Sequence, residues 1–338
     1  MASSVSWRET SLWRETSAIP ATLERTLDDG SGIAAVASLI QARHVRRVVA
    51  TGNGAAYYAA MALWLASLGG RPGPEVLCAP AGLLARGAFS WRKGDILLAF
   101  SSSGEMRDVI ESLDAGAPTP FAAITATPDS TIGSRAGAVA LVTVASQQAI
   151  THTQAFCGNV AVALSIWAAV TGDADLDTAT RSVPMLAAAA LETAESWATG
   201  LPDHLGPSAG IVFGSRHAWA GALEGALLLK EVSGIPAEGV ETREGATSAM
   251  YPLRPGHLVV SLPTAGDTLH EEAEAICAAR GATVLRAPGG DLADPRLSAV
   301  TSFPATVALA ARLGFEAGLD VDNPAWTDSY YAVARMAI

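Results

Sequence analysis

The sequence is poor in charged residues, and basic residues are the scarcer kind. Only 16% of the 338 residues are charged, and 33 acidic residues outnumber 22 basic ones, which gives a formal net charge of −11. Nucleic acids and anionic membrane surfaces select proteins with a basic face, so this balance argues against both as partners. A local site for a small anion is still compatible with it.

Cysteine is also scarce, and a signal peptide is lacking. Cys78, Cys157 and Cys277 are far apart and show neither metal-ligand spacing nor the even number of a disulfide framework. We expect three reduced thiols, no metal and no organic cofactor. The N-terminus has no basic start and no continuous apolar run. The longest weakly polar stretch, residues 155–172, only reaches the lower limit for spanning a bilayer, so we expect a cytoplasmic protein.

Apolar residues are abundant, and their pattern predicts an α/β fold. Half of the residues are apolar, and the length suits two domains of about 150 residues each. Short β-branched runs alternate with longer alanine- and leucine-rich segments, which is typical of a parallel sheet covered by helices. The predicted strands are 47–50, 75–78, 96–100, 121–125 and 140–144, then, after helices at 153–170 and 178–199, 210–213 and 257–262.

The second half of the chain repeats the organisation of the first. Gly52 and Gly214 each follow a predicted strand, and Gly104 and Gly266 follow a later strand, 52 positions further on in both halves. We infer an internal duplication with its boundary near 200–202, where Gly and Pro interrupt a helical pattern. The predicted organisation is an N-terminal helical segment at 1–30, a first domain with linker helices at 31–200, and a second domain with a C-terminal tail at 201–338.

Two turns in the first half are candidate anion sites. The strand predicted to end at residue 100 runs into a hydroxyl-rich turn and then a helix; the turn is Ser101, Ser102, Ser103, Gly104 and Glu105. Backbone N–H groups at a helix N-terminus and short hydroxyls both donate hydrogen bonds to phosphate oxygens. The alternative interpretation is simple capping of the helix by serine with a following glutamate. The turn Gly52-Asn53-Gly54 ends the first strand, and its glycines let the backbone approach a ligand closely.

These residues resemble the double-SIS (sugar isomerase) family, which includes the isomerase part of glucosamine-6-phosphate synthase, the fructosamine deglycases and the tagatose/galactosamine-type isomerases. The resemblance covers most of the chain. It rests on Gly52-Asn53-Gly54 with its helix, on 100–105 as the family's phosphate loop, on 222–226 with Lys230-Glu231, on 318–324 before the tail, and on 12–23 as an N-terminal helix.

The resemblance implies two flavodoxin-like SIS domains, each a five-stranded parallel sheet flanked by helices, in a homodimer. It also implies a phosphorylated sugar or amino sugar as ligand, with the phosphate on Ser101–Ser103. Glu231 takes the position of the base that moves a proton between C1 and C2, a task that suits a partly buried carboxylate. The alternative for Glu231 is a structural carboxylate beside Lys230. Glu224, two helical turns earlier, either orients the site or pairs with an arginine.

The sequence also departs from the family. Thr247 stands where the synthase has a histidine associated with ring opening, and threonine does not shuttle protons at neutral pH as imidazole does. The tail at 323–330 lacks the lysine that the synthase places over its substrate. His152 is a candidate to replace a missing group, or else a helix N-terminal histidine bonded to backbone. Ser215 and Arg216 occupy the strand-end turn of the second half, where Arg216 either clamps a second anionic group or makes a surface ion pair.

Two functions follow from this pattern. The first is an aldose–ketose isomerase or a fructosamine-phosphate deglycase that acts by C1/C2 proton transfer, and the sequence does not separate these two. The second is a phosphosugar-binding regulatory protein without catalysis, which Thr247 and the lysine-free tail favour.

Overall fold

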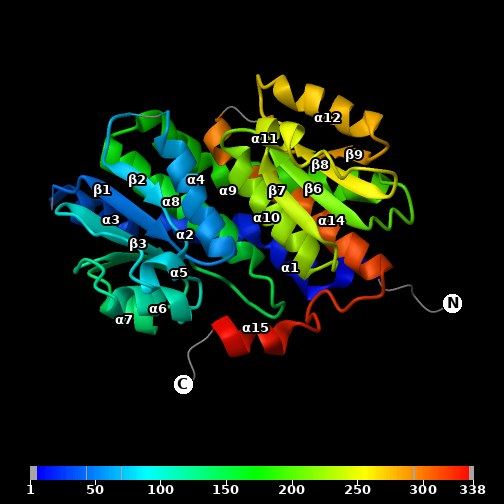
Figure 1. The fold of residues 1–338 in the computed structure, drawn as a ribbon. Helices are drawn as coiled ribbons and strands as arrows, with labels where there is room; N and C mark the ends of the chain where they lie inside the picture. The colour runs from blue at the N-terminus through cyan, green and yellow to red at the C-terminus, as the bar shows by residue number, and fades with distance from the viewer. Residues whose placement is uncertain (1–5, 43, 70, 292–293, 335–338) are drawn as a thin grey trace. The chain divides into compact units, whose positions relative to one another are not determined.

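The chain forms two parallel sheets, each in its own compact unit (Figure 1). A computed structural model describes residues 6–42, 44–69, 71–291 and 294–334. The first-sheet unit comprises residues 21–145, residues 154–184 and the described residues from Trp326 onward. The second-sheet unit comprises the described residues up to Pro20, residues 146–153 and residues 185–325.

The first sheet has five parallel strands in the order β2-β1-β3-β4-β5. The strands are β1 Arg47–Thr51, β2 Glu75–Cys78, β3 Asp95–Phe100, β4 Ala122–Thr125 and β5 Ala138–Leu141. All five predicted strands are confirmed, although β5 begins two residues earlier than expected. Every residue of β1 and β3 is buried, which explains why these strands are near-continuous apolar runs. This strand order places the switch point of the sheet between β1 and β3, where doubly wound folds bind ligands.

Helices cover both faces of the first sheet. A core cluster joins alternate residues of β1, β3 and β4 to three short helices that lie together on one side of the sheet (Figure 1). These helices are α5 Ala81–Ala85, α6 Arg107–Asp114 and α7 Thr131–Arg135, and the others in this part of the chain are α2 Ile19–Asp28, α3 Ser31–Ala42, α4 Ala55–Ser67, α8 Thr153–Thr171 and α15 Thr327–Ala334. The long helix α9, Ala174–Gly200, belongs in part to each unit.

The second sheet has the order β7-β6-β8-β9, so the described residues form four strands where five were expected. The strands are β6 Ala209–Gly214, β7 Ala237–Glu241, β8 His257–Leu262 and β9 Thr283–Arg286. The helices of this unit are α1 Ser11–Ser17, α10 Ala218–Glu231, α11 Thr242–Thr247, α12 Leu269–Ala279, α13 Ser298–Thr301 and α14 Phe303–Glu316, with 3-10 turns at Trp7–Glu9 and Pro295–Leu297. The described residues do not form the expected fifth strand, because the chain after β9 is helical from Pro295 and supplies no further strand.

The N-terminal helix predicted at 12–23 is two helices. α1 ends at Ser17, and α2 begins at Ile19, one residue before Pro20. Proline has no N–H to donate, and its ring collides with the carbonyl four residues earlier. Pro20 is therefore accommodated in the first turn of α2, and the single predicted helix is wrong.

Two helical segments are long and apolar enough to cross a membrane, but both are interior. In Thr153–Thr171, 89% of the most apolar window is buried, and in Pro295–Glu316 the whole window is buried. Their apolar composition is therefore explained by burial in the protein.

Candidate functional site

The serine loop, Ser101–Glu105, follows β3 at the switch point of the first sheet. Ser101 is 4% exposed, and its Oγ accepts a hydrogen bond from the Gly104 N–H at 3.1 Å, which closes the turn. Ser103 Oγ accepts from the Glu105 N–H at 3.3 Å. Among the described residues, the Ser102 hydroxyl and the N–H groups of Ser102 and Ser103 donate to no partner. Three donors are thus unused at the position where doubly wound sheets bind anions.

Contacts beneath the serine loop fix its shape. Gly104 has φ 67°, and a Cβ on it would lie 1.8 Å from Ser130 Oγ, so only glycine fits. Glu105 accepts hydrogen bonds from the N–H and the hydroxyl of Thr131, at 2.7 and 2.8 Å. α6 starts at Arg107, and its N-cap is Met106, which has no capping side chain. The interpretation of the serines as a simple helix cap is therefore wrong.

The turn Gly52-Asn53-Gly54 lies between β1 and α4. A Cβ on Gly52 would lie 2.8 Å from the carbonyl carbon of Ala56, and Gly54 has φ 53°. Asn53 Nδ2 donates to Asp108 Oδ2 at 3.0 Å, which links this turn to the helix that follows the serine loop. The first-sheet unit therefore brings both predicted anion-binding turns to adjacent strands, β1 and β3.

Two carboxylates with raised pKa values lie on α10. Glu224 is 2% exposed, and burial, together with the charge of Glu231, raises its pKa well above the usual 4.5. Glu231, half-buried two turns later, has its pKa raised to about 7 by burial, which Lys230 partly opposes. At neutral pH Glu231 is therefore divided between its acid and base forms. Such a carboxyl group is suited to accept and return a proton.

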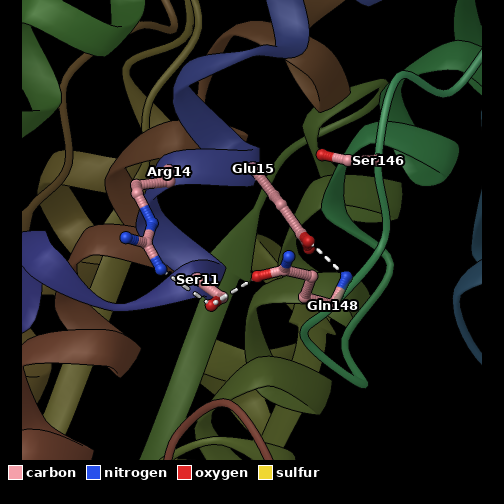
Figure 2. Close-up of a pocket in the computed structure, with 5 residues that line it drawn as sticks. All are labelled: Ser11, Arg14, Glu15, Ser146 and Gln148. Carbon is pink, nitrogen blue, oxygen red and sulfur yellow. Dashed lines mark hydrogen bonds between the residues drawn. The ribbon is translucent and has the colours of Figure 1, made fainter.

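His152 is half-buried directly before α8, on a segment that Glu15 fixes to α1 (Figure 2). Glu15 is 5% exposed and accepts hydrogen bonds from the N–H groups of Gln148 and Ala149 and from the Gln147 side chain. Burial raises the pKa of Glu15, and the two backbone hydrogen bonds oppose this rise. The position of the His152 segment thus depends on a buried carboxylate in the N-terminal helix.

A cavity of about 310 Å³ lies beside Glu15 and is lined by polar side chains; they are Ser11, Arg14, Glu15, Ser146 and Gln148 (Figure 2). The Ser11 hydroxyl donates to Gln148 Oε1 at 3.3 Å and accepts from Arg14 at 3.0 Å. Because most of these groups satisfy one another, we interpret the cavity as support for the 146–152 segment. Asp322 contributes from the 318–324 stretch: its carboxylate accepts from the first N–H groups of α1, and its carbonyl accepts from the N–H of residue 150.

The remaining predicted site residues lie in the second-sheet unit. Thr247 ends α11, and its exposed hydroxyl is within hydrogen-bond distance of the carbonyls of Arg243 and Glu244, both at 3.1 Å. Ser215 is 3% exposed in the turn after β6, and Arg216 follows it, exposed and with φ 51°. The structure thus places Thr247 and Arg216 on different elements from Glu231.

Sequence reasoning missed Asp108, Thr131 and Glu15, which hold the candidate site segments in place. Glu15 belongs to the tetrapeptide Trp-Arg-Glu-Thr, which occurs twice, yet the equivalent Glu9 is exposed. Identical local sequence gives no indication of which glutamate is buried, because burial follows from contacts with 147–149.

Two of the three cysteines have unreactive thiols. No disulfide joins the three, and burial raises the pKa of Cys78 to about 12 and that of Cys277 to about 11. Both thiols therefore stay protonated at neutral pH. Within the described ranges, no three His, Cys, Asp or Glu residues are grouped so as to hold a metal ion.

Comparison with known proteins identifies this fold. No family model matches the chain. The glutamine–fructose-6-phosphate aminotransferase (isomerizing) of Leifsonia xyli subsp. xyli is 29% identical over 265 residues, which are 68% of this chain but only 43% of that enzyme. The chain therefore matches less than half the length of that relative.

Solved structures match over nearly the whole chain. The C-terminal domain of glucosamine-fructose-6-phosphate aminotransferase from Francisella tularensis has a TM-score of 0.77 at 19% identity, covering 94% of this chain and 98% of that one. Tagatose-6-phosphate ketose/aldose isomerase from Escherichia coli has a TM-score of 0.76 at 14% identity, covering 95% and 96%. The resemblance seen in the sequence is thereby confirmed, and the chain has the double-SIS fold of these proteins.

Proposed function

We propose that this protein binds a phosphorylated sugar and moves a proton between its C1 and C2 carbons, as an aldose–ketose isomerase or a fructosamine-phosphate deglycase. The main support is Glu231, whose pKa of about 7 matches a general base that works at neutral pH. The similar proteins of known structure bear names of sugar-phosphate enzymes, one of them a ketose/aldose isomerase, which favours the same chemistry.

In this proposal the phosphate accepts hydrogen bonds from the Ser102 hydroxyl and from the N–H groups of Ser102 and Ser103. The Glu231 carboxylate takes the proton from C2 of the open-chain aldose and delivers it to C1, while a proton moves from the C2 hydroxyl to the C1 oxygen. His152 is the candidate for that second transfer, because Thr247 has no group that titrates near neutral pH. Glu224 lies two turns earlier on the same helix, and the charge of Glu231 contributes to its raised pKa.

The test is exchange with solvent of the C2 hydrogen of an aldose phosphate or of a C1 hydrogen of a ketose phosphate. Fructose, glucosamine, galactosamine and fructosamine 6-phosphates are screened by thermal shift, and any that stabilise the protein are followed by NMR in D₂O. Glu231→Gln is expected to slow exchange by about 10²- to 10⁴-fold while the sugar phosphate still binds. Glu238→Gln, which alters an exposed carboxylate of β7, is the matched control and is expected to exchange at the wild-type rate.

The second candidate function is a phosphosugar-binding regulatory protein without catalysis. Thr247 supports it, because its hydroxyl lies against backbone carbonyls, and so does the lysine-free tail. Stabilisation by a sugar phosphate without any exchange at C1 or C2 in the wild-type chain would establish this alternative. Exchange that survives in Glu231→Gln would remove Glu231 from the mechanism.

We also propose that the protein is a cytoplasmic homodimer that binds neither nucleic acid nor membrane. The net charge of −11 and the resemblance to double-SIS proteins support this assignment. Sedimentation velocity of the full chain is expected to give twice the chain mass of 34.5 kDa, and a single species of 34.5 kDa would contradict it.

A further inference from the structure

The turn after β6 in the second-sheet unit repeats the geometry of the turn after β1. A Cβ on Gly214 would lie 2.6 Å from the carbonyl carbon of Ala218, just as one on Gly52 would lie 2.8 Å from that of Ala56. Two residues later, the φ angles are 53° at Gly54 and 51° at Arg216. The two turns therefore have the same backbone course, but the second has an arginine where the first has a glycine.

The adjacent loop is repeated as well. Gly104 of the serine loop has φ 67°, and Gly266, 52 positions after Gly214, has φ 76°. Strands β6 and β8 are hydrogen-bonded neighbours, as β1 and β3 are, so this loop and the β6 turn meet at the switch point of the second sheet. The three serines are replaced there by Pro263, Thr264 and Ala265, which leaves one hydroxyl.

Arg216 has a backbone conformation that residues with side chains rarely adopt. Such a conformation persists where the surrounding structure enforces it, often at binding sites. Its guanidinium is exposed and forms no hydrogen bond or ion pair with another described residue, whereas Arg296 pairs with Asp294 at 2.6 Å. A cation without a counter-ion thus lies where the first-sheet unit has only hydroxyl and N–H donors.

Buried polar atoms at the same turn also lack partners. Ser215 is 3% exposed, and its Oγ makes no hydrogen bond with a described residue. The same is true of Nδ1 of His217, the residue that precedes α10 without capping it through its side chain. The N–H groups of Ala218 and Trp219 donate to the carbonyls of Ser215 and Arg216, whereas those of Arg216 and His217 donate to no described residue. Unused N–H groups directly before a 14-residue helix favour negative charge. The buried hydroxyl and ring nitrogen therefore belong to the residues on either side of Arg216, directly before α10.

We propose that the Ser215–His217 turn, with Thr264 on the neighbouring loop, is a second anion site that binds a phosphate group, with Arg216 supplying the positive charge. This site lies wholly in the second-sheet unit and does not depend on the serine loop or on Glu231. The first switch point offers hydroxyl and N–H donors to a phosphate. The second offers a guanidinium instead, which binds phosphate through two parallel N–H donors. The ligand of this second site would be a phosphate-containing molecule other than the substrate.

The experiment titrates the full chain with inorganic phosphate by isothermal titration calorimetry. The variant Ser102→Ala/Ser103→Ala first weakens the serine loop, and Arg216→Gly is then added to it. Glycine adopts φ 51° without strain, so the fold is expected to survive the change. The matched control is Arg254→Ala. It removes one exposed positive charge near the amino end of β8, which is the opposite end of the strands from the Ser215–His217 turn.

The serine-loop variant is expected to keep one phosphate per chain, and Arg216→Gly is expected to weaken that binding by roughly tenfold or more. Arg254→Ala is expected to leave it within about twofold. Equal weakening by both arginine changes, no effect of Arg216→Gly, or no phosphate bound to the serine-loop variant would each overturn the second site. If the serine changes alone leave phosphate binding unaltered while Arg216→Gly abolishes it, the serine loop fails as the substrate's phosphate site and the second site stands.

Discussion

Replacing Glu231 by glutamine is expected to stabilise the folded protein at alkaline pH. Its pKa is about 7 in the folded state against 4.5 as an ordinary glutamate, so folding disfavours the charged form. At about 1.4 kcal/mol per pKa unit, the shift corresponds to at most about 3.5 kcal/mol of stability. Partial exposure screens the charge, so we expect about 2 kcal/mol.

The sign of the pH dependence follows from the same shift. Below pH 4.5 both folded and unfolded chains hold the proton, and the wild type has no penalty. Between pH 4.5 and 7 the unfolded chain ionises first, so wild-type stability falls, and above pH 7 the full penalty is present. Glu231→Gln has no charge to bury and lacks this fall.

Urea unfolding at pH 4.5 and pH 8 measures the effect. We expect wild type and Glu231→Gln to have similar midpoints at pH 4.5 and the variant to be more stable by about 2 kcal/mol at pH 8. Glu238→Gln, which alters an exposed carboxylate of β7, is the matched control and is expected to change stability little at either pH. A Glu231→Gln effect that is equal at both pH values, or a loss of stability at pH 8, would refute the reasoning.

Three further changes test local contacts in the fold. Gly104→Ala forces a side chain into φ 67° and places Cβ 1.8 Å from a hydroxyl oxygen, so calorimetry is expected to show a loss of about 3 kcal/mol, and an unchanged melting temperature would contradict this. Asp95→Ala leaves Arg47 buried without its 2.6 Å ion pair and is expected to cost about 4 kcal/mol in urea unfolding; a loss below about 1 kcal/mol would show that the pair contributes little. Glu15→Ala leaves the N–H groups of residues 148 and 149 without their acceptor, so their hydrogen exchange is expected to accelerate and the stability to fall by about 2 kcal/mol. Unchanged protection of these two N–H groups would show that Glu15 does not hold the segment in place.

The central strands could be predicted from the sequence because they are buried on both faces. The prediction at 257–262 coincides with β8, and that at 210–213 lies within β6; both strands are almost wholly buried and mostly apolar. The edge strands β7 and β9 were not predicted. β7 has two glutamates and a glycine in five residues, and β9 has only four residues, two of them exposed. Without a buried, alternating pattern, such strands are specified by pairing with β6 and β8 rather than by their own sequence.

The candidate site could be predicted only where the residue type itself determines the geometry. Gly52 and Gly104 could be identified as site residues because each position requires glycine. The backbone of α4 lies too close to Gly52 for a Cβ, and Gly104 has a positive φ. The pKa of Glu231 and the hydrogen bonds from residues 147–149 to Glu15 could not be predicted, because both depend on burial by segments distant in sequence. Arg216 was noticed as a possible anion ligand, but its left-handed backbone became evident only in the structure.

The most direct test of the central claim is binding of a sugar phosphate at the serine loop. Thermal shift of the wild-type chain is measured with each hexose 6-phosphate and with the corresponding unphosphorylated sugar, and repeated with Ser102→Ala/Ser103→Ala. We predict that at least one phosphorylated sugar stabilises the wild type, that the unphosphorylated sugars do not, and that the double variant loses most of the response. Equal stabilisation by both kinds of sugar, an undiminished response in the variant, or no response to any sugar phosphate would contradict the account.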